Sequence, residues 1–143
     1  MNSWPNGRRT RVADYVIDAS SVLVFAFNEQ GSDTVEDFAR HDRLMISSVN
    51  MAEILAKLDD KGWPKETIVG LLSVLSLDEI PFDAQHSVLS ANLRTITRPL
   101  GLSLGDRCCL ALALKTGAPV LTADRSWTSI ADALGLSITI TRD

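Results

Sequence analysis

Short apolar stretches alternate with longer amphipathic ones along the chain. The short stretches predict strands, over residues 14–18, 44–46, 77–80, 119–124 and 137–140. The longer stretches predict helices, over residues 20–28, 32–41, 48–60, 65–75, 84–97, 104–116 and 125–134. Strands that alternate with helices, without hairpin turns, are typical of an α/β fold. We therefore expect a three-layer α/β/α sandwich around a central, mostly parallel sheet of four to five strands.

The stretch from Gly101 to Asp124 carries a geometric prediction. A helix from Asp106 to Thr116 advances roughly 15 Å at 1.5 Å per residue. An extended segment from Pro119 to Asp124 returns roughly 16 Å at 3.3 Å per residue. The carboxylates of Asp106 and Asp124 should therefore lie side by side.

Two further acids are expected at the same edge of the sheet. Asp18 ends the first predicted strand, and Glu53 lies one turn into the helix that follows the second strand. Ligands of open parallel sheets bind at the carboxyl ends of strands. Each acid also has an ordinary structural role open to it, since three of them are placed to cap helices and Glu53 can be a solvated helix residue. Their convergence is the more economical explanation.

Four carboxylates without a histidine or cysteine partner favour a hard cation, Mg²⁺ or Mn²⁺, over zinc. We expect Asp18, Glu53 and Asp106 to hold the main ion, with Asp124 completing the site directly or through water. Mg²⁺ shares its shell with phosphate oxygens, and metal-bound water is a nucleophile near neutral pH. Hydrolysis of a nucleic-acid backbone fits this chemistry best.

Polar and basic residues surround these positions in the sequence. Ser20, Asn50 and Thr122 are each within three residues of an acid and could orient carboxylates or water, although ordinary turn or helix-start bonding is an equal alternative. Four arginines could bind RNA phosphates on the way to the site, with solvated helix positions as the alternative; these are Arg94, Arg98, Arg107 and Arg125.

Length and composition limit the possible classes of protein. The 143 residues, 45% of them apolar, suit one globular domain over residues 14–143, preceded by a polar, flexible tail over residues 1–13. No stretch approaches the roughly 20 apolar residues of a membrane span, so a cytoplasmic protein without membrane contact is expected. Cys108 and Cys109 are neighbours on one predicted helix, which argues against a disulfide between them.

Four motifs together resemble the PIN domain, and in particular the VapC toxins of bacterial toxin–antitoxin pairs. They are Val-Ile-Asp18-Ala-Ser20, Ser48-Val-Asn50-Met-Ala-Glu53, Gly105-Asp106-Arg-Cys-Cys-Leu-Ala-Leu-Ala and Leu-Thr122-Ala-Asp124-Arg-Ser-Trp127. Each motif alone is weak, but their order and spacing extend over residues 14–140. By position, Asp18, Glu53, Asp106 and Asp124 match the acidic quartet of the family, and Ser20, Asn50 and Thr122 match its polar companions. Trp127 stands where the family commonly has phenylalanine.

The resemblance implies a Mg²⁺- or Mn²⁺-dependent endoribonuclease that cuts tRNA, rRNA or mRNA. It also implies a homodimer and a cognate VapB-like antitoxin. The apolar helix that contains Val22 and Phe27 could supply part of a groove for the antitoxin or for a second copy, and burial within the monomer is an equal alternative. A non-catalytic interaction module, an RNA-processing nuclease and a DNA nuclease remain the competing hypotheses.

Overall fold

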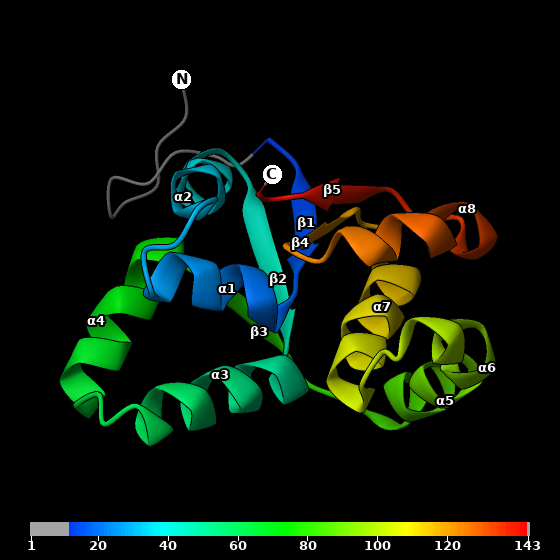
Figure 1. Cartoon of the computed structure of the whole chain (residues 1–143), viewed down its shortest axis with the longest axis horizontal. Helices are drawn as coiled ribbons and strands as arrows, with labels where there is room; N and C mark the ends of the chain where they lie inside the picture. Colours follow the sequence, from blue (N-terminus) through cyan, green and yellow to red (C-terminus); the bar gives the residue numbers. More distant parts are fainter. Residues whose placement is uncertain (1–11, 143) are drawn as a thin grey trace.

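Five parallel strands form the centre of the molecule (Figure 1). The computed structural model describes residues 12–142. The strands are β1 (Asp14–Ile17), β2 (Arg43–Ser47), β3 (Asp78–Ile80), β4 (Val120–Thr122) and β5 (Ile138–Ile140). They lie in the order β3-β2-β1-β4-β5, and all four neighbouring pairs are parallel. The predicted fold class is confirmed.

Helices cover both faces of this sheet. Those of the first half of the chain are α1 (Ala19–Ala26), α2 (Ser32–His41), α3 (Ser48–Asp60) and α4 (Lys65–Leu75). Those of the second half are α5 (Ala84–Asn92), α6 (Arg94–Thr97), η1 (Arg98–Leu100), α7 (Leu104–Thr116), η2 (Arg125–Ile130) and α8 (Ala131–Leu134), with η marking 3₁₀ helices. Figure 1 shows the first group on the left of the sheet and the second group on the right.

Alternation along the strands explains the two layers. Successive strand residues point to opposite faces of a sheet. Val16, Met45 and Val120 accordingly pack in one buried cluster with α7 residues, whereas Ile17 and Leu121 pack in a second cluster with residues of α1 to α4. The register pairs Val16 with both Met45 and Val120, and Ile17 with Leu121. Each face of the sheet therefore has its own core.

The predicted helix over 84–97 is interrupted at Leu93, where α5 ends and α6 begins. In one continuous helix the Ser90 carbonyl would accept a hydrogen bond from the Arg94 N–H. It instead accepts one of 3.1 Å from the guanidinium of Arg107 on α7. The prediction of one continuous helix was wrong here, and a tertiary contact from Arg107 lies beside the break.

The predicted helix over 125–134 is a 3₁₀ helix, η2, followed by the single α turn of α8. Hydroxyl side chains bond to nearby carbonyls in this segment, Thr128 to Arg125 at 2.8 Å and Ser129 to Ser126 at 2.8 Å. Such local bonds compete with the regular hydrogen bonds of an α-helix. The apolar spacing located the segment correctly but did not specify its geometry.

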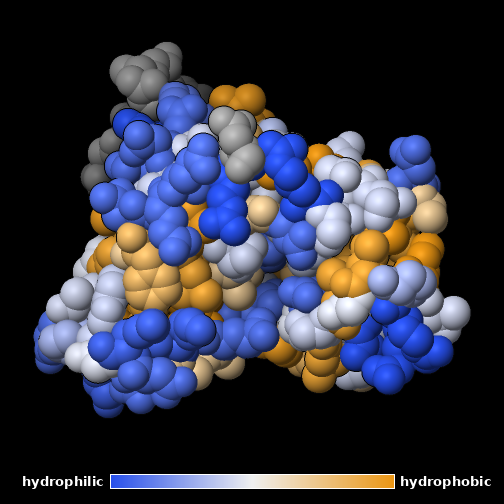
Figure 2. Space-filling model, in the orientation of Figure 1, coloured by the Kyte–Doolittle hydropathy of each residue, from blue (hydrophilic) through white to orange (hydrophobic). Residues whose placement is uncertain are grey.

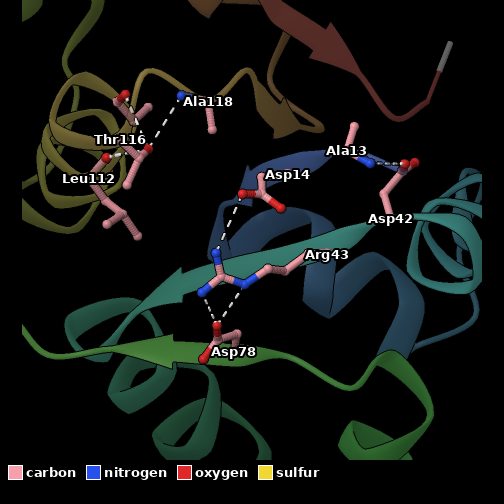
Figure 3. A network of polar contacts seen from close by, with 9 residues as sticks. Ala13, Asp14, Asp42, Arg43, Asp78, Leu112, Thr116 and Ala118 are labelled. Carbon is pink, nitrogen blue, oxygen red and sulfur yellow. Dashed lines mark hydrogen bonds and ion pairs between the residues drawn. The ribbon is translucent and has the colours of Figure 1, made fainter. Parts of the chain in front are cut away.

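Ionic contacts join three strands at the amino-terminal edge of the sheet. Arg43 at the start of β2 lies between Asp14 of β1 and Asp78 of β3, and its Nε donates to Asp78 at 2.8 Å (Figure 3). The backbone just before β1 is held at this edge as well, because the Val12 N–H donates to the His41 carbonyl at 3.0 Å. Of the tail predicted over residues 1–13, residues 1–11 lie outside the described part of the chain.

Two negative findings hold for residues 12–142. No helix in this range combines the length and the apolar character that a membrane crossing requires. Cys108 and Cys109 are both buried free thiols, as their adjacency on one helix predicts.

Candidate functional site

The predicted acids stand at the opposite, carboxyl-terminal edge of the sheet. Asp18 directly follows β1, and Asp124 follows β4 after one intervening residue. Glu53 lies in the second turn of α3, the helix that follows β2. Asp106 lies in the first turn of α7, which runs back toward the start of β4. Four separate segments therefore bring carboxylates to one edge.

Asp18 is the buried member of the group, with 3% of its surface exposed. Its Oδ2 accepts hydrogen bonds from Thr122 Oγ1 at 2.6 Å and from Ser20 Oγ at 2.7 Å. Its Oδ1 accepts from the Ser21 N–H at 2.9 Å, which caps α1. Burial raises the pKa of this carboxyl above its ordinary value, and the hydrogen bonds from Thr122, Ser20 and Ser21 oppose the rise.

The two hydroxyls beside Asp18 also hold the segment that carries Asp124. Ser20 Oγ accepts from the Ala123 N–H at 3.3 Å, and Thr122 Oγ1 accepts from the Asp124 N–H at 3.0 Å. A chain of hydrogen bonds thus runs from Asp18 through two side chains to the backbone of Asp124. The polar residues expected to orient carboxylates do contact one.

Glu53 is exposed, but its carboxylate is held on the α7 side of α3. Asn50 Nδ2 donates to Glu53 Oε1 at 2.9 Å and to the Gly105 carbonyl at 2.9 Å. The carboxylate lies so close to Gly105 that a Cβ added there would overlap it, at 2.6 Å from Glu53 Cδ. Gly105 is the residue before Asp106, so Glu53 and Asp106 belong to the same corner of the site.

Asp106 and Asp124 have the structural roles that their local sequences suggest. Asp106 forms a capping box with Ser103, whose N–H donates to Asp106 Oδ2 at 2.9 Å. Asp124 is exposed and caps η2, accepting from the N–H of Ser126 at 3.0 Å. A cap does not exclude a role at the site, because the positive ends of helix dipoles favour carboxylates at helix starts.

Three of the acids influence the same buried thiol electrostatically. Burial raises the pKa of Cys109 well above its ordinary value, and the negative charges of Asp18, Asp106 and Glu53 raise it further. Cys109 lies in α7 with no exposed surface. The charge of the residue that follows β1 and the charges of one residue each in α3 and α7 therefore act on the same buried group.

The side chains do not form a closed metal cage. Within residues 12–142, no three Asp, Glu, His or Cys side chains stand close enough to hold an ion directly. The donor set is nevertheless chemically suited to a hard cation, since it contains carboxylate oxygens alone. Mg²⁺ is commonly held by one or two carboxylates and keeps several waters. The residues thus fit a hydrated Mg²⁺ or Mn²⁺ ion, and direct coordination by Asp18, Glu53 and Asp106 together is not seen.

The four arginines considered for RNA divide into two groups. Arg94, Arg98 and Arg125 are exposed, and Arg125 adjoins Asp124 in the chain. Arg107 has 9% of its surface exposed and donates to the Ser90 carbonyl. Its guanidinium joins α7 to α5, so its burial argues against the phosphate-binding role predicted for it.

Sequence reasoning missed two members of the site. Ser21 contributes its N–H to Asp18, and its Oγ lies 2.9 Å from Thr141 Oγ1 at the end of β5. The third position of a helix after an N-cap is the usual donor to the cap, so Ser21 could have been found. The second missed residue is Gly105. Its contact with Glu53 depends on how α3 and α7 cross, which the local sequence does not predict.

Comparison with known proteins supports the same fold. The sequence model of the PIN domain family matches residues 15–133. No curated protein sequence matches the chain.

The first similar structure is VapBC2 from Rickettsia felis bound to a DNA fragment from its promoter, with a TM-score of 0.68 and 20% identity, covering 89% of this chain and 98% of that one. The second is DNA-bound VapBC from Salmonella typhimurium, with a TM-score of 0.69 and 16% identity over 91% and 99% of the two chains. The third is VapBC-5 from Mycobacterium tuberculosis, a member of the VapBC family of toxin–antitoxin systems, with a TM-score of 0.60 and 22% identity over 92% and 100% of the two chains. The TM-scores show a shared fold, and at identities this low the comparison establishes the fold alone.

Proposed function

Since the chain belongs to the PIN domain family, we propose that it is a divalent-metal-dependent endoribonuclease and the toxin of a VapBC-type toxin–antitoxin pair. Residues 14–143 would form its single nuclease domain, and it would act in the cytoplasm on tRNA, rRNA or mRNA. The observation that carries the proposal is the placement of four acids from separate segments at the carboxyl-terminal edge of the parallel sheet, namely Asp18, Glu53, Asp106 and Asp124.

The proposed cofactor is Mg²⁺ or Mn²⁺. Asp18, Glu53, Asp106 and Asp124 would hold it, directly or through its waters. When bound, such an ion supplies an activated water and neutralises charge on the phosphate that is cut. Without an ion the gathered carboxylates would repel both one another and an RNA phosphate.

Hydrogen bonds from neighbouring residues orient the Asp18 carboxylate for cation binding. Three hydrogen bonds, from Ser20, Ser21 and Thr122, fix both oxygens of its carboxylate. Because Thr122 is fully buried and belongs to the sheet, one of these donors has a rigid support. Hydrogen bonds to the ionised form favour it, so the network holds a buried carboxylate ready to bind a cation.

The substrate proposal rests on exposed arginines, one of which, Arg125, adjoins Asp124 in the chain. Arg94, Arg98 and Arg125 supply guanidinium groups suited to phosphate oxygens. Single-stranded RNA is recognised largely through unstacked bases and backbone contacts. We propose that these arginines hold the RNA backbone on either side of the bond that is cut.

The partner proposal rests on an apolar surface between the first four helices. Several partly buried residues there pack against the core without being covered, among them Phe25, Phe27, Trp63, Leu71 and Leu72. Phe27 and Trp63 form an edge-to-face pair with ring centroids 5.7 Å apart. Figure 2 shows hydrophobic atoms in the region framed by α1, α3 and α4. We propose that a VapB-like antitoxin binds here, and that the toxin also forms a homodimer.

RNA cleavage by purified protein tests the enzymatic proposal. We expect Mg²⁺ or Mn²⁺ to support cleavage of total RNA, excess EDTA to abolish it, and Asp106→Asn to lower it at least 100-fold. Sequencing of new RNA 5′ ends after induction of the wild-type protein and of Asp106→Asn in cells would identify the target. Cleavage that persists in EDTA would refute the metal-dependent mechanism.

A non-catalytic interaction module is the second candidate, because the caps formed by Asp18, Asp106 and Asp124 account for three of the acids without any cation. Such a module would bind an antitoxin-like peptide but would neither take up Mn²⁺ nor cut RNA. Calorimetric titration of the wild-type protein with Mn²⁺ therefore separates the two candidates.

A further inference from the structure

The position of Glu53 depends on two residues that carry no charge. Glu53 belongs to α3 and is exposed, so burial does not fix its carboxylate. The carboxylate nevertheless lies against Gly105 in α7, with its Cδ 2.6 Å from the place of a Cβ there. A long, exposed side chain has several rotamers open to it. An arrangement that selects one of them needs specific contacts with the carboxylate.

Asn50 supplies one such contact, and its amide orientation is determined by its partners. The side-chain nitrogen of Asn50, Nδ2, lies 2.9 Å from Glu53 Oε1 and 2.9 Å from the Gly105 carbonyl oxygen. Both partners are acceptors, so the NH₂ group must face them, and a reversed amide would place its oxygen against two oxygens. Asn50 is 1% exposed and lies in the first turn of α3. It therefore connects α3 to α7 through Glu53 and the backbone.

Gly105 supplies the second contact by having no side chain. Any Cβ at this position would overlap the Glu53 carboxylate, so a larger residue would push it away. Gly70 in α4 offers the opposite case, because a Cβ there meets nothing within 4 Å. Both glycines are helical and neither has a positive φ. Helix propensity alone predicts that alanine would stabilise both positions.

We propose that Asn50 and Gly105 are positioning residues that hold the Glu53 carboxylate where it takes part in binding the divalent cation. Asn50 pulls one carboxylate oxygen toward α7, and the bare surface of Gly105 leaves the space that the carboxylate fills. The proposal rests on the proposed metal-dependent function and adds that the affinity for the cation is set by the contact between α3 and α7.

The first experiment compares Gly105→Ala with Gly70→Ala. Mn²⁺ affinity is measured by calorimetry in the absence of RNA, and folding is checked by circular dichroism and thermal unfolding. We expect Gly105→Ala to weaken Mn²⁺ binding about 10- to 100-fold, the range found when groups that orient metal ligands are altered. Gly70→Ala should bind Mn²⁺ as the wild type does.

The second experiment exchanges the donor of Asn50 for an acceptor. Asn50→Asp has nearly the same shape but presents oxygens to Glu53 and to the Gly105 carbonyl, whereas Asn50→Leu removes the amide and adds no charge. Mn²⁺ affinity should fall in both, and further in Asn50→Asp. Asn92→Asp, the same chemical change at the exposed end of α5, is the control and should leave affinity unchanged.

A double-mutant cycle separates positioning from a general loss of structure. In a Glu53→Gln background, Gly105→Ala should cause little further loss of Mn²⁺ affinity, because the group that it displaces no longer carries the charge. Equal losses in both backgrounds would overturn the inference, as would unchanged affinity of folded Gly105→Ala. A wild-type protein that takes up no Mn²⁺ at all would instead overturn the proposed function, and the inference with it.

Discussion

Thr122 Oγ1 donates a 2.6 Å hydrogen bond to Asp18 Oδ2, joining two residues that are 104 positions apart in the chain. The pair connects the carboxyl ends of β4 and β1, which are neighbours in the sheet. Both residues are buried, so the bond is shielded from water. Parallel pairing of these two strands is what brings a hydroxyl to the central carboxylate of the site.

Replacement of Thr122 by valine tests the weight of this bond. Valine keeps the shape of the side chain and removes the hydroxyl, which leaves a buried carboxylate with one donor fewer. We expect the free energy of unfolding to fall by about 1.5–3 kcal/mol, the range for hydrogen bonds to charged groups. Unfolding in urea measures this change in the free energy of unfolding. Thr95→Val at an exposed position should change little, and equal stability of the two variants would contradict the assignment.

The pH dependence of stability should carry a contribution from Asp18. Burial raises its folded-state pKa above the ordinary 3.8. At a pH between the unfolded-state pKa and the higher folded-state pKa, the native state keeps a proton that the unfolded chain loses. Stability therefore falls as the pH rises through this window from the first value to the second. The contribution is constant above the folded-state pKa and vanishes below the unfolded one.

Asp18→Asn isolates that contribution in metal-free protein. The variant has no carboxyl to titrate at this position, so its free energy of unfolding relative to the wild type should increase as pH rises through the window. Urea titrations at a series of pH values measure the difference. Saturating Mn²⁺ should then raise the melting temperature of the wild type but not that of the variant. A pH-independent difference would show that Asp18 titrates normally.

Arg107 should matter for stability rather than for RNA. Its guanidinium is buried and donates to the Ser90 carbonyl, so Arg107→Met removes a charged hydrogen bond between α7 and α5. We expect a loss of roughly 1.5–3 kcal/mol in the free energy of unfolding. Arg94→Met on the exposed surface of α6 should stay within about 0.5 kcal/mol of the wild type. A larger loss of stability in Arg94→Met than in Arg107→Met would refute the structural role assigned to Arg107.

RNA binding should depend on the exposed arginines. Each of Arg94→Met, Arg98→Met and Arg125→Met should weaken binding and reduce the slope of log affinity against log salt by about 0.7, the value for one phosphate contact on a single strand. Binding is measured on the Asp106→Asn background so that the RNA stays intact. Arg40→Met in α2 serves as the control, since the carboxyl end of α2 leads into the amino-terminal edge of the sheet. An unchanged salt slope in all three variants would exclude these arginines from the RNA path.

Local patterns predicted the order of the strands and helices well but failed where side chains interfere with the backbone. The prediction of a helix over 84–97 included Leu93, yet α5 ends at Asn92, close to the Ser90 carbonyl that accepts a hydrogen bond from Arg107. The 3₁₀ geometry of η2 follows from hydroxyls that bond to carbonyls, which apolar spacing does not reveal. Local sequence thus locates an element more reliably than it fixes the element's geometry.

The candidate site divides in the same way. The position of Asp18 at a strand end and the helix–strand lengths around Asp106 were enough to expect a gathering of carboxylates, because parallel strands all end at one edge. The contact of Glu53 with Gly105 could not be expected, since it depends on how α3 and α7 cross. The same is true of the hydroxyl from Thr122.

By itself, the sequence determined the parallel architecture and the edge at which the acids lie, because apolar alternation and segment length are local properties of the chain. Only the tertiary structure decided which groups touch. It placed Thr122 on Asp18, Asn50 between Glu53 and Gly105, and Arg107 inside the protein. Contacts of this kind depend on angles between helices and on side-chain packing, which residues distant in the chain set together.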